Sequence, residues 1–160
     1  VMGVSSNFGM AFAKSQTAAF GPLPKQGAVF ISLSERDKDS AWRSARELAN
    51  LNFKIYATAG THKFLAEKGI PSELVRKNSD QVNDQLSANE IITKGLVQLV
   101  INTPLGRGSR QDGWLIRSAA VSRGVPCITT IPGFRAAVSG ITALQSADFE
   151  IKSLQEWMHK

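Results

Sequence analysis

The side chains best suited to bind a small anion follow apolar runs that predict strands. Thr58-Ala59-Gly60-Thr61 follows one such run, Asn102 and Thr103 follow another, and Lys38 comes shortly after a third. Glycine lets the backbone approach a ligand closely, and the first turn of a helix offers N–H groups and a favourable dipole to an anion. Ligands of open parallel sheets bind beyond the carboxyl ends of the strands. The pattern therefore predicts that hydroxyl, amide and ammonium groups converge on a phosphate.

Thr61 also has a purely structural interpretation. Threonine is an ordinary N-cap residue, so Thr61 could serve only to begin the helix that the sequence predicts over residues 61–68. The motif taken alone does not separate this role from ligand binding.

The charge balance favours a negatively charged partner. The chain has 19 Lys and Arg against 13 Asp and Glu, a net charge of +6. Such an excess suits nucleic acid, a membrane surface or a phosphorylated small molecule, and it equally suits a solvated basic face. Between residues 103 and 147 the basic residues are spread out, with no Lys/Arg block and no aromatic-basic platform for stacking bases. We therefore expect a phosphate pocket, and neither nucleic acid nor a membrane as partner.

Patterns typical of catalysis or metal binding are sparse. His62 has no obvious carboxylate partner, and Cys127 follows Pro126 in an apolar run, where a buried and inert thiol is the simpler interpretation. The single cysteine excludes an internal disulfide framework and a multi-cysteine metal site. No HExxH pair, P-loop or dinucleotide-binding glycine fingerprint occurs. The sequence thus predicts binding, with no catalytic residue and no metal.

Five strand-like runs alternate with helical ones along the 160 residues. The alternation predicts an α/β fold: a doubly wound, mostly parallel five-stranded sheet with helices on both faces. The expected strands are Ala28–Leu33, Phe53–Ala57, Glu73–Arg76, Val97–Ile101 and Pro126–Thr129. The expected helices are Asp37–Leu51, Thr61–Lys68, part of Ser79–Lys94, Asp112–Arg123, Phe134–Leu144 and Lys152–Met158.

The first residues predict a separate helical element. Val1–Ala19 has helical spacing with Asn7 or Ser6 as N-cap, and a linker rich in proline and glycine follows. We expect residues 1–20 to be the last helix of a preceding domain, 21–26 a linker, and 27–160 the main domain of a fragment from a larger protein. No apolar run approaches the roughly 20 residues of a membrane span, and no signal peptide is recognisable, so we expect a cytoplasmic location.

Four segments occur in the order and spacing of a known family. From about Gly27 to Lys160 the chain resembles the methylglyoxal-synthase-like domain at the C-terminus of the carbamoyl phosphate synthetase large subunit, bacterial type. The segment from Phe8 to Gln16 resembles the last helix of that subunit's second synthetase half. The segments are Thr58-Ala59-Gly60-Thr61, Val100-Ile101-Asn102-Thr103-Pro104, Ile116-Arg117-Ser118-Ala119-Ala120 and Val125-Pro126-Cys127-Ile128-Thr129-Thr130.

The resemblance implies an allosteric regulatory domain. Bacterial members bind nucleoside monophosphates, UMP as inhibitor and IMP as activator, and so control carbamoyl phosphate synthesis for pyrimidine and arginine biosynthesis. Lys77 fits this nucleotide-responsive branch, because the branch activated by N-acetylglutamate has tryptophan there. Pro104 departs from members with a threonine at that position. The implied phosphate and ribose ligands are Lys38, Thr58, Thr61, Lys77, Asn102 and Thr103, and Thr129 would lie at the edge of an ornithine site.

The same resemblance implies that the chain is not itself an enzyme but part of an ATP-dependent, glutamine-hydrolysing ligase. No cofactor is expected in this domain, since ATP, Mg and K would bind the synthetase domains. The implied partners are the nucleotide, the rest of the large subunit, the glutaminase small subunit and further copies of the chain in a homo-oligomer.

The alternative is methylglyoxal synthase itself, a lyase that acts on dihydroxyacetone phosphate. That reaction needs carboxylates to remove a proton beside the carbonyl and a histidine to move protons. Here the enzyme's Gly-Gly-Asp is at best echoed by Ser79-Asp80, its Asp-Pro-Leu becomes Thr103-Pro104-Leu105, and its histidine becomes Arg110. The resemblance therefore favours regulation over lyase chemistry.

Overall fold

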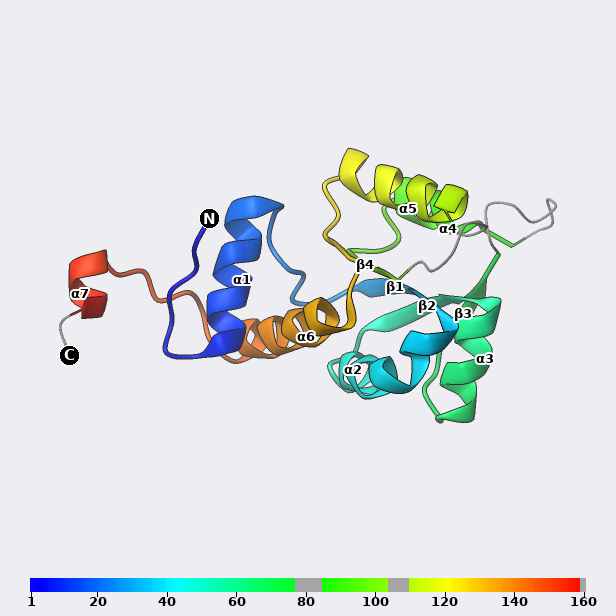
Figure 1. The fold of residues 1–160 in the computed structure, drawn as a ribbon, viewed down its shortest axis with the longest axis horizontal. Coiled ribbons are helices and arrows are strands. Elements are labelled where there is room, and N and C mark those ends of the chain that lie inside the picture. The colour runs from blue at the N-terminus through cyan, green and yellow to red at the C-terminus, as the bar shows by residue number, and fades with distance from the viewer. Residues whose placement is uncertain (77–84, 104–109, 159–160) are drawn as a thin grey trace.

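A five-stranded parallel sheet forms the centre of the fold (Figure 1). The computed structural model describes residues 1–76, 85–103 and 110–158. The strand order is β3-β2-β1-β4-β5, and every neighbouring pair is parallel. This confirms the predicted doubly wound α/β fold. The strands are β1 (Ala28–Leu33), β2 (Lys54–Thr58), β3 (Glu73–Val75), β4 (Leu99–Thr103) and β5 (Cys127–Ile128).

The chain enters the sheet at its middle strand, builds outward to β3, and then returns to the other side of β1 with β4. The two innermost strands are apolar on both faces because helices cover both, so their sequences show no alternation with polar residues. The order reverses between β1 and β4, and ligands of such sheets bind beside a reversal of this kind. In the register of that pair, Ser32 of β1 lies opposite Asn102 of β4.

The helices form two layers, visible on either side of the sheet in Figure 1. On one face Leu48 and Leu65 pack with Ile31 and Ile101, and on the other Ile91 packs with its own set of strand residues. The first layer holds α1 (Phe8–Ala19), α2 (Lys38–Asn50), α3 (Ala59–Glu67) and α6 (Ile131–Ser146), and the second holds α4 (Ala88–Thr93) and α5 (Arg110–Ser122).

Two shorter elements complete the described chain. A 3₁₀ turn, η1 (Glu35–Asp37), leads into α2, and α7 (Leu154–Met158) stands beyond α1, away from the sheet (Figure 1). Of the helices described, none is both long and apolar enough to cross a membrane.

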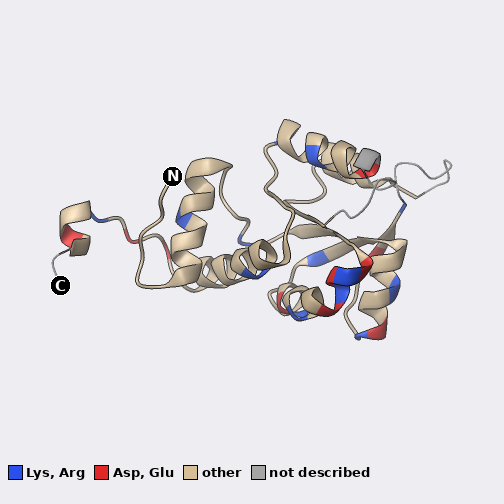
Figure 2. Cartoon of the chain, in the orientation of Figure 1, with Lys and Arg blue, Asp and Glu red and all other residues tan. Residues whose placement is uncertain are grey.

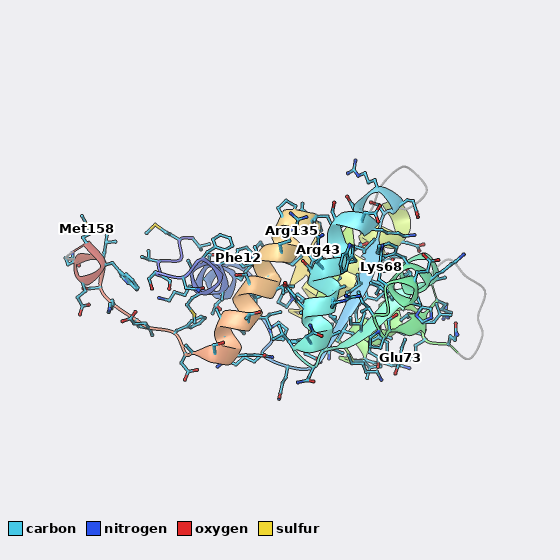
Figure 3. The ribbon with its side chains drawn as sticks, turned by 90° about the horizontal axis from the view of Figure 1, so that it is seen from below. Phe12, Arg43, Lys68, Glu73, Arg135 and Met158 are labelled. Carbon is cyan, nitrogen blue, oxygen red and sulfur yellow. The ribbon has the colours of Figure 1, made fainter. Side chains whose placement is uncertain are left out.

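The N-terminal helix packs on the main domain. It begins at Phe8, because the Asn7 side chain caps it by accepting from the Met10 N–H, which confirms Asn7 as one of the two predicted N-caps. The helix lies directly against α6 (Figure 3), and a Cβ atom on Gly9 would sit 2.3 Å from the Ser139 carbonyl oxygen. Leu23, in the predicted linker, is buried in the same core. The assignment of residues 1–20 to a preceding domain stays a prediction.

Several predicted boundaries were wrong by two or three residues. The α3 helix begins at Ala59, two residues before the predicted Thr61. The β4 strand continues through Asn102 to Thr103, which were expected to follow it. The α6 helix begins at Ile131, since the Thr130 side chain accepts from the Gly133 N–H and caps it. Side-chain capping, which hydrophobic periodicity does not report, decides the last of these boundaries.

Candidate functional site

Three polar side chains form a row across the carboxyl ends of β2, β1 and β4. The Thr58 hydroxyl donates to the Ser32 hydroxyl at 3.3 Å, and Ser32 is the register partner of Asn102. Thr58 and Asn102 are buried, with 6 % and 3 % of their surface exposed. Sequence reasoning missed Ser32, although a serine near the end of the otherwise apolar run Ala28–Leu33 was a usable signal.

Asn102 carries a buried donor that the fold does not use. Its side-chain nitrogen Nδ2 is sealed from solvent and has no hydrogen-bond partner; among the described residues it is the one side-chain atom of this kind. A buried polar group left unpaired costs about 1–3 kcal/mol. This unpaired donor lies at the reversal point of the sheet, where ligands of open parallel sheets bind.

The neighbouring threonines, by contrast, are tied into the fold. Thr61 is the third residue of α3 and not its cap, so the structural interpretation offered for it was wrong. Its hydroxyl accepts from the Leu33 N–H at 3.0 Å and lies 3.5 Å from the Thr58 hydroxyl. The Thr103 hydroxyl accepts from the Ser34 N–H at 3.1 Å. Both residues hold the end of β1 in place beneath the site.

Lys38 brings a positive charge to the start of α3. Its ammonium nitrogen is 3.8 Å from where a Cβ atom on Gly60 would lie, and 5.9 Å from the centre of the Phe64 ring. The side chain is only 13 % exposed, and its ammonium pairs with Glu35 at 2.6 Å. A cation is unfavourable at the positive end of a helix dipole unless an anion lies beside both. In the structure the Glu35 carboxylate is the anion beside Lys38.

Comparison with known proteins identifies the family. The family model described as "MGS-like domain" matches residues 40–129, from the first turn of α2 to the residue after β5. The chain belongs to the MGS-like domain family. The resemblance drawn from the sequence is thereby confirmed.

Three relatives, each described as the carbamoyl phosphate synthase large chain, are similar to nearly the whole chain. The identity is 51 % over 160 residues for the protein of Mycobacterium sp. (strain JLS). It is 48 % over 158 residues for that of Streptomyces coelicolor, and 49 % over 160 for that of Mycobacterium tuberculosis (strain H37Rv). Each match covers 98 % of this chain and 14 % of the relative. The chain therefore spans about one seventh of the length of these relatives, in their C-terminal region.

The MGS-like domain gathers five of the predicted ligand residues at one edge of its sheet: Lys38, Thr58, Thr61, Asn102 and Thr103. Lys77, the sixth, lies outside the described residues, as does Pro104. Thr129 lies apart from them: it is exposed after β5 and lines a separate cavity of about 440 Å³ between α1, α5 and β5. The roles proposed for all of these residues stay predictions.

The other candidate groups of the MGS-like domain have structural surroundings. Burial raises the pKa of the Cys127 thiol to about 11 although Arg117 opposes the shift, so the thiol is protonated and weakly nucleophilic at neutral pH. His62 Nδ1 lies 2.9 Å from the Ser72 hydroxyl and links α3 to the start of β3. Within the described chain no group of three His, Cys, Asp or Glu could hold a metal ion.

Charge is mixed around the site. Figure 2 shows basic and acidic residues interleaved on η1, α2 and α3, so this part of the domain is not a face of one sign. A pocket that draws one anion to Lys38 suits this distribution better than an extended polyanion does.

Proposed function

We propose that this MGS-like domain is the allosteric regulatory domain of a carbamoyl phosphate synthase large chain and binds a nucleoside monophosphate, UMP or IMP, at the carboxyl ends of β1, β2 and β4. One observation carries the proposal: the side-chain nitrogen of Asn102 is buried without an acceptor where three strand ends place polar groups together. The names of the relatives and the resemblance supply the biological setting.

The site offers a different contact to each part of such a ligand. Lys38 and the first turn of α3 present positive charge and backbone donors, which suit a phosphate. Asn102 offers an amide donor, and the Ser32 and Thr58 hydroxyls can donate or accept, which suits oxygen atoms of a ribose or base. We assign Lys77 to the same ligand on the resemblance alone.

Regulation needs a second site outside this chain, because allostery is a free-energy coupling between two sites. We place that site in the rest of the large chain, with the ATP, Mg and K sites of the synthetase domains and a glutaminase small subunit as further partners. Thr129 would contribute to an ornithine site at the boundary with those domains. On this proposal the chain has no turnover of its own and resides in the cytoplasm.

No described observation favours the lyase alternative. Thr103 stands where the resemblance puts a lyase carboxylate, and its hydroxyl accepts from the Ser34 N–H. Ser79, Asp80 and the side chain of Arg110 lie outside the described residues. Incubation of the chain with dihydroxyacetone phosphate should release no methylglyoxal above a heat-killed control. Robust release would contradict the regulatory proposal and support the lyase alternative.

Calorimetry and thermal melting with UMP and IMP test the binding proposal, with uridine and inosine as controls that lack the phosphate. Ligand at about 100 times its dissociation constant stabilises a fold by about 2.7 kcal/mol, which raises the melting temperature measurably. We expect this for at least one nucleotide and a much smaller shift for its nucleoside. The absence of both heat and shift at millimolar nucleotide would contradict the proposal. Assay of the complete synthetase with and without each nucleotide then gives the sign of regulation.

A further inference from the structure

Glu35 occupies the position of an anion at the proposed phosphate site. Its carboxylate oxygen Oε2 lies 2.6 Å from the Lys38 ammonium, and that ammonium lies beside Gly60 in the first turn of α3. Because helix starts and ammonium groups both attract anions, the best place for a phosphate is the place that this carboxylate neutralises.

The two partners of this ion pair differ in how firmly they are held. The Lys38 side chain is 13 % exposed and packs over the Phe64 ring, whereas the Glu35 side chain is 87 % exposed. Among the described residues the Glu35 carboxylate makes no other ion pair or side-chain hydrogen bond. The Glu35 side chain can therefore move into solvent while Lys38 stays in place, and the free-energy cost is that of the ion pair alone.

The turn that carries Glu35 does not depend on its carboxylate. Asp37, in the same turn, accepts from the Ser34 hydroxyl at 2.6 Å, and the Ser34 N–H is held by Thr103. These contacts fix η1 at the end of β1 with the Glu35 side chain left out. The hydrogen bonds that hold this turn against β4 therefore do not involve the Glu35 carboxylate.

We propose that Glu35 is an internal competitor that lowers the affinity of the site for phosphate-bearing ligands. This rests on the proposed function of the site. A phosphate with up to two negative charges displaces the single carboxylate from Lys38, whereas a nucleoside without phosphate leaves the ion pair intact. Glu35 thereby raises the nucleotide concentration at which the site fills, and it favours ligands that carry a phosphate over those that do not.

Glu35→Gln tests this in the 160-residue chain, with UMP and IMP as probes and uridine and inosine beside them. A partly exposed ion pair of this kind is worth little, so we expect nucleotide to bind about two- to fivefold more tightly to the variant. Nucleoside affinity should not change. The gain should vanish in the background of Lys38→Met, because no cation is then left to compete for.

Glu47→Gln is the matched control, since Glu47 is an exposed carboxylate on α2 with no ion pair among the described residues. An equal gain there would show a general effect of net charge and overturn the inference. A parent that binds nucleotide together with an E35Q variant that binds no better would overturn it too, and leave the proposed function standing. If neither parent nor E35Q binds any nucleotide, the proposed function itself is wrong.

Discussion

The polar groups at the proposed nucleotide site and those at the start of α4 differ in how completely they are paired. At the α4 junction Arg76 donates to the Glu90 carboxylate at 3.0 Å. The same carboxylate accepts from the Ser87 N–H at 2.7 Å, and the Ser87 hydroxyl accepts from the Glu90 N–H at 3.2 Å. Each of these side chains has a partner within the chain. At the site, Asn102 keeps a buried donor without one.

This difference separates stabilisation from binding. The reciprocal bonds of Ser87 and Glu90 form a capping box that satisfies N–H groups at the start of a short helix, and Arg76 joins it to the end of β3. The side chains of Arg76, Ser87 and Glu90 thus satisfy one another. On the proposed function, the free-energy cost of the unpaired Asn102 donor is recovered when a ligand atom accepts a hydrogen bond from it.

The largest effect should come from Lys38→Met, which removes the charge but keeps an unbranched stem over Phe64. Loss of a charge-assisted contact costs about 1.5–3 kcal/mol, so nucleotide should bind about ten- to a hundredfold more weakly by calorimetry. The melting temperature should change little. Arg76→Met is the matched control, because the Arg76 side chain is equally shielded at 12 % exposure. Arg76→Met should lower the melting temperature and leave nucleotide affinity unchanged. If instead Lys38→Met lowered only the melting temperature and Arg76→Met lowered only the affinity, Lys38 would be the structural residue and Arg76 the binding residue.

A smaller effect, of opposite sign on stability, is expected for Asn102→Leu. This change removes the unpaired donor, so the free energy of unfolding should stay level or rise by up to about 1 kcal/mol. Nucleotide affinity should fall about three- to tenfold, since a neutral hydrogen bond is lost. Urea denaturation and calorimetry on the same sample measure both quantities. A clear loss of stability with unchanged binding would make Asn102 a structural residue.

The smallest expected effect is on the melting temperature at low pH. Hydrogen bonds from Ser87, and then the nearby Arg76 and Lys94, hold the pKa of the Glu90 carboxyl below its ordinary value despite partial desolvation. A carboxyl whose pKa is lower in the folded state stabilises the protein above its unfolded pKa, and that stabilisation is lost as the pH falls through the folded pKa. Glu90→Gln keeps a side chain suited to the capping box but has no carboxyl to protonate. As the pH falls from neutral to about pH 3, only the parent loses this stabilisation, so the melting temperatures of parent and variant should converge. Parallel melting curves over that range would contradict this. The pKa values of Asp148 and Glu156 are also lowered, but both residues are present in the parent and in the variant. They therefore do not contribute to the difference between the two melting curves.

Much of the site followed from one topological rule applied to the sequence. Lys38, Thr58, Asn102 and Thr103 lie near the ends of apolar runs, and parallel strands bring such ends to one edge. The individual roles did not follow. Thr61 was weighed as a helix cap, yet its hydroxyl accepts from Leu33, which is distant in sequence and adjacent only in the folded chain.

The sequence by itself determined the architecture, because alternating strand and helix patterns allow few ways to cover both faces of a parallel sheet. The family resemblance is likewise a property of the sequence, and comparison with known proteins confirms it. Only the tertiary structure decided which polar groups the fold uses and which it leaves open. Thr61 and Thr103 accept hydrogen bonds from the end of β1, whereas the side-chain nitrogen of Asn102 is left without a partner. The reason is geometric: a hydrogen bond depends on distances of a few tenths of an ångström between residues that the sequence separates by tens of positions.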